Sequence, residues 1–327
     1  MNAAIRRATV FALALVLVAA GAALAQMDRF VPVTDEMLVN AADDPNNWLM
    51  WRRTYNHWGY SPLDQINRDN VASLQLVWAR AMEPGLQETT PLVYNGIMYL
   101  VHSPDVVEAL DATTGDLIWR YERELPEVYP PLAFANRNIA IYQDKIFLAT
   151  ADAALVALDA RTGQVVWEQQ VGDWTVGQHY SGGPMVVKGK VIAGMSGCYY
   201  INTRCFVTAH DPETGEELWR TYTIPAPGEP GDETWNGLPL ELRYGGSAWM
   251  SASYDPELDL IFQGTAVPIQ WTSAQRGTGD GDVLYTNSTL ALDPDTVKSH
   301  SVCKKWSGSC GGLLPLRQVS EALVRLL

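Results

Sequence analysis

The sequence has few of the residues and motifs that mark the common catalytic and metal-binding sites. Its 327 residues include four cysteines and five histidines, and none of these lies at the spacing of a zinc site. It contains no P-loop, no dinucleotide-binding fingerprint and no Ser–His–Asp constellation. These absences argue against a zinc centre, a nucleotide-binding fold and a serine hydrolase.

Basic residues are also scarce in most of the chain. The formal net charge is −14. The first 25 residues carry two Arg and no acid, and residues 297–327 carry +4, so residues 26–296 carry −20. Such an acidic body argues against nucleic-acid binding and suits an exported domain that meets a basic protein partner.

Charged side chains are absent from residues 8–25, which follow Arg6 and Arg7. This apolar run ends in Ala23-Leu24-Ala25, a pattern that predicts a secretory signal peptide (1–25) cleaved before Gln26. No cysteine follows the small residues, which argues against a lipoprotein anchor. The run is long enough for an uncleaved membrane anchor to remain as the alternative; after cleavage we expect no stable membrane span.

Convincing helix-period patterns are missing outside the two ends of the chain, whereas 12 Trp and 26 Gly are present. This balance favours an all-β fold over an α/β fold. One motif recurs, Ala-x-Asp-x-x-Thr-Gly-x-x-x-Trp. Its three complete copies run from Ala109 to Trp119, from Ala157 to Trp167 and from Ala209 to Trp219; a fourth begins at Ala291 and breaks after Thr296, where Val297 replaces Gly and Ser301 replaces Trp.

The residue types of the motif have a structural explanation. Asp and Thr side chains hydrogen-bond the backbone of a tight turn, and Gly adopts a positive φ there. The small Ala and the large Trp predict an indole that packs closely against a neighbouring repeat. Successive copies begin 48, 52 and 82 residues apart, which fits four-stranded propeller blades with an insertion in the last.

Further turn signals locate the hairpins. We expect hairpins at 93–101 around Asn95-Gly96, at 139–148 around Gln143-Asp144-Lys145, and at 185–194 around Lys188-Gly189-Lys190, with another strand pair opening at Tyr254. Residues 225–239 are rich in Pro, Gly and acidic residues, which predicts an inserted surface loop.

The C-terminal tail departs from the repeat in composition, charge sign and period, all after Thr296. We therefore expect residues 297–327 to be a frameshifted or truncated end, with a divergent natural tail as the alternative. The predicted organisation is a signal peptide (1–25), a lead-in segment (26–62), a partial β-propeller of about four blades (63–296) and this aberrant tail (297–327).

Together the repeat, the segment 51–63 (Trp-Arg-Arg-Thr-Tyr…Trp-Gly-Tyr-Ser-Pro-Leu) and the segment 245–258 (Gly-Gly-Ser-Ala-Trp…Tyr-Asp-Pro-Glu-Leu) resemble the quinoprotein alcohol dehydrogenases. The resemblance covers roughly residues 45–296. It implies about half of an eight-bladed propeller that holds pyrroloquinoline quinone (PQQ) beside calcium, oxidises small alcohols in the periplasm and passes electrons to cytochrome c.

The resemblance also implies which residues bind the quinone. Arg137, in Asn136-Arg137-Asn138, matches an arginine that contacts a quinone carboxylate, which suits its planar guanidinium. Trp249 matches the indole that forms a floor under the ring system. The other matching positions are Glu88, Ser181, Ser196, Gly197, Cys198 and Ser247. Taken singly, Glu88 could be a surface carboxylate, Arg137 a structural ion-pair partner and Trp249 a core residue.

The chain also departs from the family pattern. The family's adjacent cysteine pair falls at Pro131-Leu132. Its calcium ligands fall at Tyr199, a phenol, and at Val267, which has no side-chain oxygen, so calcium at the usual place is in question. The family's catalytic aspartate lies beyond Thr296, and no catalytic residue is assigned in this chain.

Cys198 and Cys205 are separated by six residues in a chain expected to be exported. A local disulfide is the preferred interpretation, with free thiols as the alternative.

Two functions remain open at this stage. The first is a PQQ-dependent alcohol dehydrogenase in ancestry, inactive as this chain because the catalytic half is missing. The alternative is a non-catalytic propeller that serves as a binding or scaffold protein of the cell envelope. The joint occurrence of Glu88, Arg137, Ser181 and Trp249 favours the first, because a scaffold does not need them.

Overall fold

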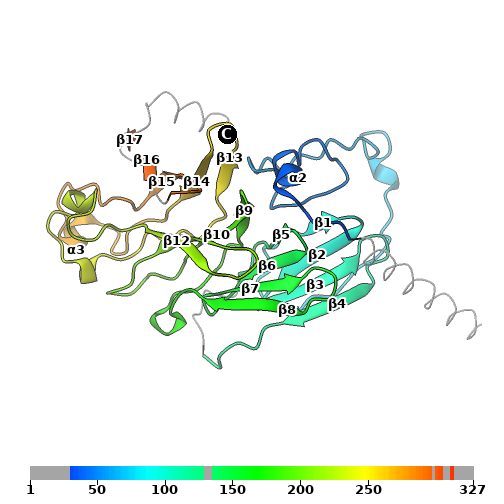
Figure 1. Ribbon diagram of the computed structural model, residues 1–327, viewed down its shortest axis with the longest axis horizontal. Coiled ribbons are helices and arrows are strands. Elements are labelled where there is room, and N and C mark those ends of the chain that lie inside the picture. The colour runs from blue at the N-terminus through cyan, green and yellow to red at the C-terminus, as the bar shows by residue number, and fades with distance from the viewer. Residues whose placement is uncertain (1–29, 129–134, 297–298, 305–309, 313–327) are drawn as a thin grey trace, which may run out of the picture.

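The computed structural model describes residues 30–128 and 135–296, together with the backbone of residues 299–304 and 310–312. Nearly all regular structure in these residues is antiparallel sheet (Figure 1). Four sheets follow one another in chain order along an arc. The predicted all-β propeller is confirmed, and the described sheets form an incomplete ring.

Each sheet consists of consecutive strands. The first contains β1 (Leu92–Tyr94), β2 (Ile97–His102), β3 (Val106–Asp111) and β4 (Leu117–Glu122). The second contains β5 (Ala140–Tyr142), β6 (Lys145–Ala149), β7 (Ala154–Asp159) and β8 (Val165–Gln170). The third contains β9 (Met185–Val187), β10 (Lys190–Gly194), β11 (Phe206–His210) and β12 (Glu217–Tyr222). The fourth contains β13 (Ser253–Asp255), β14 (Leu260–Gly264), β15 (Ser288–Leu292), β16 (Ser299–Lys304) and β17 (Cys310–Gly312).

The predicted hairpin turns join the first two strands of the first three sheets. Asn95 and Gly96, between β1 and β2, have φ values of 51° and 76°, the conformation of the tight turns that match strand twist. Gln143 and Lys188 begin the equivalent turns with φ values of 51° and 49°. The hairpin predictions at these places are confirmed.

The recurring motif forms the turn between the third and fourth strands. In the first sheet, Asp111 Oδ1 accepts hydrogen bonds from the backbone N–H groups of Thr113 (2.8 Å) and Thr114 (3.1 Å). Equivalent bonds occur at Asp159, Asp211 and Asp293. The strand register shifts at the Ala of each copy, so the bulge and the turn repeat together.

Each motif tryptophan docks on the turn of the next sheet, as the sequence predicts. Trp119 Nε1 donates to the carbonyl of Ala160 at 3.0 Å, and Trp167 Nε1 donates to that of Pro212 at 2.9 Å. A Cβ added to Gly163 would lie 2.5 Å from the Trp119 ring. Glycine is therefore needed at this position for two reasons: its backbone has a φ of 71°, and a side chain would occupy the space of the indole.

The lead-in segment (described from residue 30 to residue 62) crosses the sheets. It contains α2 (Asp35–Val39), which Thr34 caps by accepting a hydrogen bond from Met37 N. Val33 N donates to Gln143 O in the second sheet (2.9 Å), Trp48 N to Val93 O in the first (2.7 Å), and the Tyr55 hydroxyl to Val186 O in the third (2.7 Å). The segment therefore ties three sheets together.

Short helices interrupt the connections. They are η1 (Val71–Ser73), η2 (Trp174–Val176), η3 (Asp232–Trp235), η4 (Leu240–Leu242) and α3 (Ser273–Arg276). The predicted surface loop at 225–239 is largely exposed, but Trp235 within it is fully buried with Ile224 and Val283 in a small core of its own. Its indole N–H bonds the Leu284 carbonyl, which offsets the cost of burying that polar group.

Part of the predicted aberrant tail forms strands. β16 pairs with β15 from Ser288↔Lys304 to Leu292↔Ser299 and so takes the fourth-strand position, with β17 beyond it. Backbone pairing does not depend on side-chain identity, which explains how a sequence without the motif can fill this position. The domain boundary at 297 stays a prediction, and Val297 lies outside the described residues, as do residues 1–29 with the predicted signal peptide.

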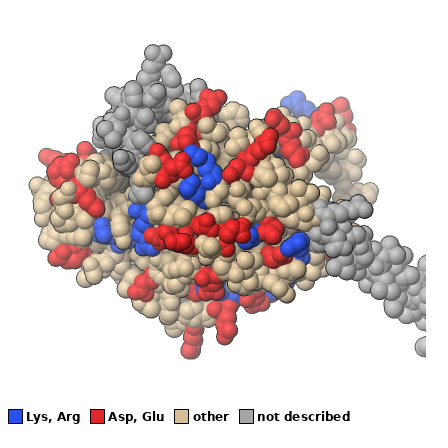
Figure 2. All heavy atoms as spheres, in the orientation of Figure 1, with Lys and Arg blue, Asp and Glu red and all other residues tan. Residues whose placement is uncertain are grey.

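On the face that Figure 2 shows, acidic side chains form a band across the middle, with Lys and Arg between them. Many of the basic groups are already paired. Lys188 binds Asp259 at 2.7 Å and also Asp295, which Lys190 contacts at 2.7 Å. The acidic excess predicted from composition therefore reaches the surface.

Candidate functional site

Four segments, each just before the first strand of a sheet, converge with a fifth segment that follows β10. Thr90, just before β1, donates its N–H to Arg137 O at 3.0 Å, just before β5. His179 and Ser196 exchange two backbone hydrogen bonds of 3.2 and 2.9 Å, and Ala248 N donates to Met195 O at 2.9 Å. These backbone bonds join neighbouring segments side by side, and the segments carry most of the predicted site residues.

Arg137 lies at the centre of this cluster. Its Nη2 is 2.5 Å from Glu88 Oε2, and its Nη1 donates to Ser181 O at 2.6 Å. The guanidinium carbon lies 4.9 Å from the centroid of the Trp249 ring, in the geometry of a cation–π contact. The structure therefore brings Glu88, Arg137, Ser181 and Trp249 together although they lie on four segments of the chain.

The predicted hydroxyl groups lie deeper. Ser181 Oγ is 3.1 Å from Ser196 Oγ, and both side chains are buried. Ser247 is also buried, with its Oγ 3.6 Å from Cys205 Sγ. Ser196 and Ser247 therefore lie behind the part of the cluster that reaches solvent, where Trp249 is 39% exposed.

A disulfide joins Cys198 and Cys205, and both residues are buried. It lies between Ser196 and Ser247, because Cys198 Sγ contacts Ser196 O at 3.7 Å and Cys205 Sγ contacts Ser247 Oγ. Gly197, in the same segment, has a φ of 78°, and a Cβ there would lie 1.9 Å from Gly177 O. The disulfide and this close approach fix the segment behind the cluster.

The cluster has the groups that a flat, carboxylated quinone requires. Trp249 offers an exposed aromatic face, and Arg137 offers a guanidinium fork beside it. Two buried polar atoms without a hydrogen-bond partner, Gln87 Oε1 and Thr89 Oγ1, flank Glu88. These atoms are neighbours of Glu88 in the sequence, and the fit to a planar, carboxylated ligand rests on the Trp249 face and the Arg137 guanidinium.

The same residues do not fit a calcium ion at the family's position. Tyr199 and Val267 stand at the two ligand positions and are 37% and 43% exposed. Calcium requires six to eight oxygen ligands, and Val267 has none in its side chain. In the described part of the chain, no group of three or more His, Cys, Asp or Glu side chains is placed to hold a metal ion.

His179 and His210 have structural roles. His179 Nδ1 is 2.9 Å from Gly177 O, and His210 Nδ1 is 3.0 Å from Gly215 O. Burial lowers the pKa of both imidazoles, in spite of these hydrogen bonds, which act in the opposite direction. Both rings are therefore neutral at pH 7.

Two glycines that sequence reasoning missed allow the segments to approach. A Cβ on Gly182 would lie 2.4 Å from Trp249 O, and a Cβ on Gly183 would lie 1.8 Å from Asn138 O. Asn138 Oδ1 in turn accepts from Gly183 N (2.9 Å) and from the Ser251 hydroxyl (2.8 Å). The adjacent glycines after Ser181 were the available signal, since paired glycines often mark close backbone contact.

We expect Gly183→Ala to lower the free energy of unfolding by about 2–3 kcal/mol, because the added methyl group must displace the backbone beside Arg137. Chemical denaturation followed by tryptophan fluorescence measures this loss. Gly228→Ala is the control, since its φ is 84° but no atom lies within 4 Å of the added Cβ. A loss at Gly183 no greater than at Gly228 would contradict the steric explanation.

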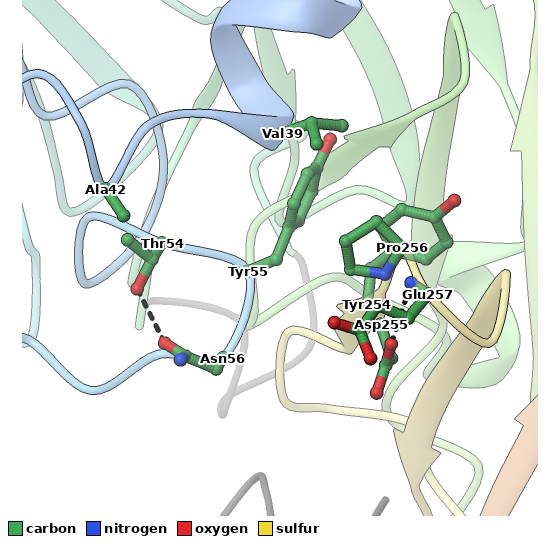
Figure 3. A pocket seen from close by; sticks show the side chains of 9 residues that line it. All are labelled: Val39, Ala42, Thr54, Tyr55, Asn56, Tyr254, Asp255, Pro256 and Glu257. Atoms are coloured by element: carbon green, nitrogen blue, oxygen red, sulfur yellow. Dashed lines mark hydrogen bonds between the residues drawn. The ribbon is translucent and has the colours of Figure 1, made fainter.

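Two cavities lie outside the cluster. One of about 250 Å³ separates the lead-in segment from the fourth sheet, with Tyr55 on one wall and Pro256 and Glu257 on the other (Figure 3). The other, of about 530 Å³, is lined by Val267, Trp271 and Arg276, among others. It adjoins the cluster through the hydrogen bond from Ala266 N to Ser247 O (2.9 Å).

Comparison with known proteins links this geometry to one group. Residues 48–300 match the glucose/ethanol/alcohol dehydrogenase β-propeller domain, a PQQ domain. The quinohemoprotein alcohol dehydrogenase ADH IIB of Pseudomonas putida is 40% identical over 280 residues, covering 81% of this chain and 40% of that protein. This chain spans about 40% of the length of the curated relatives that it matches.

Solved structures agree. The quinohemoprotein alcohol dehydrogenase of Comamonas testosteroni superposes with a TM-score of 0.73 at 35% identity, covering 88% of this chain and 44% of that one. A europium-containing methanol dehydrogenase superposes with a TM-score of 0.75 at 33% identity, covering 81% and 50%. The similarity therefore extends over most of the described sheets.

Proposed function

Because the chain belongs to the glucose/ethanol/alcohol dehydrogenase family of PQQ β-propeller domains, we propose that its Arg137–Trp249 cluster binds pyrroloquinoline quinone. The observation that carries this proposal is the stacking of Arg137 on Trp249 while the same guanidinium pairs with Glu88. A cation and an aromatic face at one solvent-accessible point match a planar carboxylate better than they match a structural core.

The chain's own residues would bind and orient the cofactor. Trp249 provides the flat apolar surface, and Arg137 holds a carboxylate. Glu88 and the carbonyl of Ser181 fix the guanidinium. When bound, a quinone of this kind supplies a two-electron acceptor for alcohol oxidation. The buried disulfide keeps the segment 196–198 rigid behind the site.

We further propose that this chain alone does not oxidise alcohols. The supporting observation is the chemistry of Tyr199 and Val267, which leaves the family's metal position without carboxylate or amide ligands. The ancestry that we propose is that of an alcohol dehydrogenase acting on small alcohols with cytochrome c as electron acceptor.

We also propose a periplasmic location, on the basis of the N-terminal apolar run and the acidic body. In the described part of the chain, no helix has the length and apolar character needed to cross a membrane. Residues 1–29, which include the predicted signal peptide, lie outside that part.

The proposal is tested by titrating the purified chain with PQQ and following quenching of tryptophan fluorescence. We expect saturable binding, and we expect Arg137→Ala and Trp249→Ala each to weaken it at least tenfold, or about 1.4 kcal/mol. Arg161→Ala and Trp58→Ala are matched controls, because Arg161 lies in the second repeat turn and Trp58 is 63% exposed in the lead-in segment.

The same samples test whether the chain oxidises alcohols. With PQQ and calcium added, we expect no reduction of an artificial dye by primary alcohols, and clear turnover would overturn the proposed inactivity. Absence of PQQ binding would instead favour the non-catalytic binding or scaffold protein of the cell envelope.

A further inference from the structure

The cavity of about 530 Å³ includes the residue at one of the family's metal-ligand positions. Its lining consists of Val267, Pro268, Trp271, Arg276, Val283, Thr286 and Asn287. Among the described residues this lining has no Asp or Glu, and its charged group is the Arg276 guanidinium. A guanidinium repels a metal ion and attracts an anion. The charge of the cavity is therefore opposite to the charge that a calcium site requires.

Within the described part of the chain, Arg276 has no acidic partner. Its Nη1 donates to Gln270 O at 2.6 Å, and its Nε is buried without a hydrogen-bond partner. Burial lowers the pKa of this guanidinium, and no neighbouring carboxylate counteracts that shift. Because a half-buried charge without a counter-ion is unfavourable, the cavity is suited to a ligand that brings a negative charge.

Other arginines show how this protein satisfies a guanidinium. Arg80 binds both carboxylate oxygens of Glu108 through Nε and Nη2, at 2.8 and 2.7 Å. Arg123 binds Asp152 through the same two nitrogens, at 2.7 and 2.8 Å. This two-point contact is the geometry that guanidinium and carboxylate groups prefer. In the described structure Nε and Nη2 of Arg276 have no such partner, so the edge that binds carboxylates is unused.

The remainder of the lining is suited to a flat apolar body. Trp271 is 76% exposed, and Pro268, Val267 and the buried Val283 add apolar surface. The helix α3 begins just after Trp271 and ends at Arg276, so a single turn of helix sets the spacing between the indole and the guanidinium. The volume of the cavity lies in the range of pockets that hold small organic molecules.

We propose that this cavity binds a small organic carboxylate with a planar apolar body, without a metal ion. Arg276 binds the carboxylate through Nη2 and, once its side chain turns away from Gln270 O, also through Nε. Trp271 packs against the apolar body, as aromatic side chains do in ligand sites. The family's cation position is thereby converted into an anion site in this chain.

The cavity is distinct from the proposed quinone site, although it adjoins that site. Its lining does not include Arg137 or Trp249. Gly246 N donates to Val267 O at 3.1 Å, so a ligand in the cavity would lie beside the segment that carries Trp249. The proposal goes beyond quinone binding and does not depend on it, because the chain without PQQ should already bind the carboxylate.

Isothermal titration calorimetry of the PQQ-free chain with benzoate and with benzamide tests the proposal. The two ligands have the same ring and nearly the same size, but only benzoate is charged at pH 7. We expect benzoate to bind at least tenfold more tightly, or about 1.4 kcal/mol. This comparison uses the unaltered chain and depends on no variant. Equal affinities, or no binding of benzoate, would overturn the proposal.

Variants assign the preference to the named residues. Arg276→Gln should remove it, and Arg276→Lys, which keeps the charge but loses the fork, should recover part of it. Val267→Asp should weaken benzoate binding at least tenfold through repulsion, whereas the uncharged Val267→Asn should not. Arg68→Gln removes an exposed guanidinium outside the lining and is the control. With thermal unfolding confirming that each variant folds, unchanged benzoate affinity in Arg276→Gln would contradict the assignment.

Calcium and PQQ distinguish this site from the sites of the family. We expect calcium ions to leave the affinity for benzoate unchanged, and we expect the chain saturated with PQQ to bind benzoate as the free chain does. Benzoate binding that requires calcium would indicate a metal site, and displacement of benzoate by PQQ would place the cavity within the quinone site; either result would overturn the proposal. A chain that binds benzoate but not PQQ would uphold this proposal and refute the proposed function.

Discussion

Replacing Trp119 by alanine is expected to lower the free energy of unfolding by about 3–5 kcal/mol. The indole is 7% exposed, its N–H bonds the Ala160 carbonyl, and its ring covers Gly163. Removing it leaves a cavity between two sheets and an unpaired carbonyl at the turn. Because the same contact joins every pair of neighbouring sheets, the loss should appear as one cooperative destabilisation, measured by urea denaturation.

Two further variants separate the parts of this contact. Trp119→Phe keeps most of the ring and should cost only about 1 kcal/mol through the lost hydrogen bond together with a smaller packing defect. Trp271→Ala removes an indole that is 76% exposed and should change stability by less than about 0.5 kcal/mol. Equal effects of Trp119→Ala and Trp271→Ala would show that docking does not hold the sheets together.

Asp105 is expected to make the protein less stable as pH rises from 4 to 8. Its carboxyl is fully buried, and burial raises its pKa to about 7, although hydrogen bonds from Ala151 N and Asn136 Nδ2, both 2.7 Å, favour the charged form. The folded state thus binds the proton more tightly than the unfolded state. The stabilisation is complete below pH 4 and is lost as pH passes through about 7.

Asp105→Asn isolates this contribution, because the amide is neutral at every pH. The difference in unfolding free energy between the natural protein and the variant should fall by about 4 kcal/mol between pH 4 and pH 8, at 1.36 kcal/mol per pKa unit. Asp64→Asn, at an exposed position, is the control and should show no such trend. A pH-independent difference at Asp105 would mean that the carboxyl stays charged in the folded protein.

The repeat could be predicted from sequence because local chemistry determines it. Asp111, Thr114 and Gly115 lie within one turn, and each has a role that depends on its neighbours in the chain. The docking of the tryptophan was also predictable, since only an adjacent repeat offers a suitable surface. The docking of Trp78, whose Nε1 donates to Ala112 O, was missed because the turn residues of the motif do not precede it, although Leu76-Val77-Trp78 resembles Leu117-Ile118-Trp119.

The contacts of the candidate site, in contrast, could not be predicted from the sequence. Family resemblance named Arg137 and Trp249, but no sequence pattern could show that the guanidinium stacks on the indole and also binds Glu88. These contacts join residues on separate segments and depend on how far neighbouring sheets rotate. The clash that a side chain at Gly183 would make with Asn138 likewise appears only when the segments are placed in space.

The buried Trp235 shows a further limit. Its surroundings in the sequence are polar and rich in turn-forming residues, which predict a surface loop. Ile224, directly before the segment, and Val283, far beyond it in the chain, lie in the same buried cluster as Trp235. The composition of a segment reflects the polarity of most of its residues and does not reveal a single buried residue that anchors it.

The lead-in segment bears on the order in which the chain can fold. Each sheet pairs strands that are close in sequence, so it can form soon after its own residues are available. Tyr55 must wait much longer, because its hydroxyl bonds Val186 and its carbonyl accepts from Tyr254 N. The earliest described part of the chain is thus held in place by some of the latest, and it stays unsettled until the fourth sheet exists. We therefore expect the lead-in segment to become fixed in place only after the third and fourth sheets have formed.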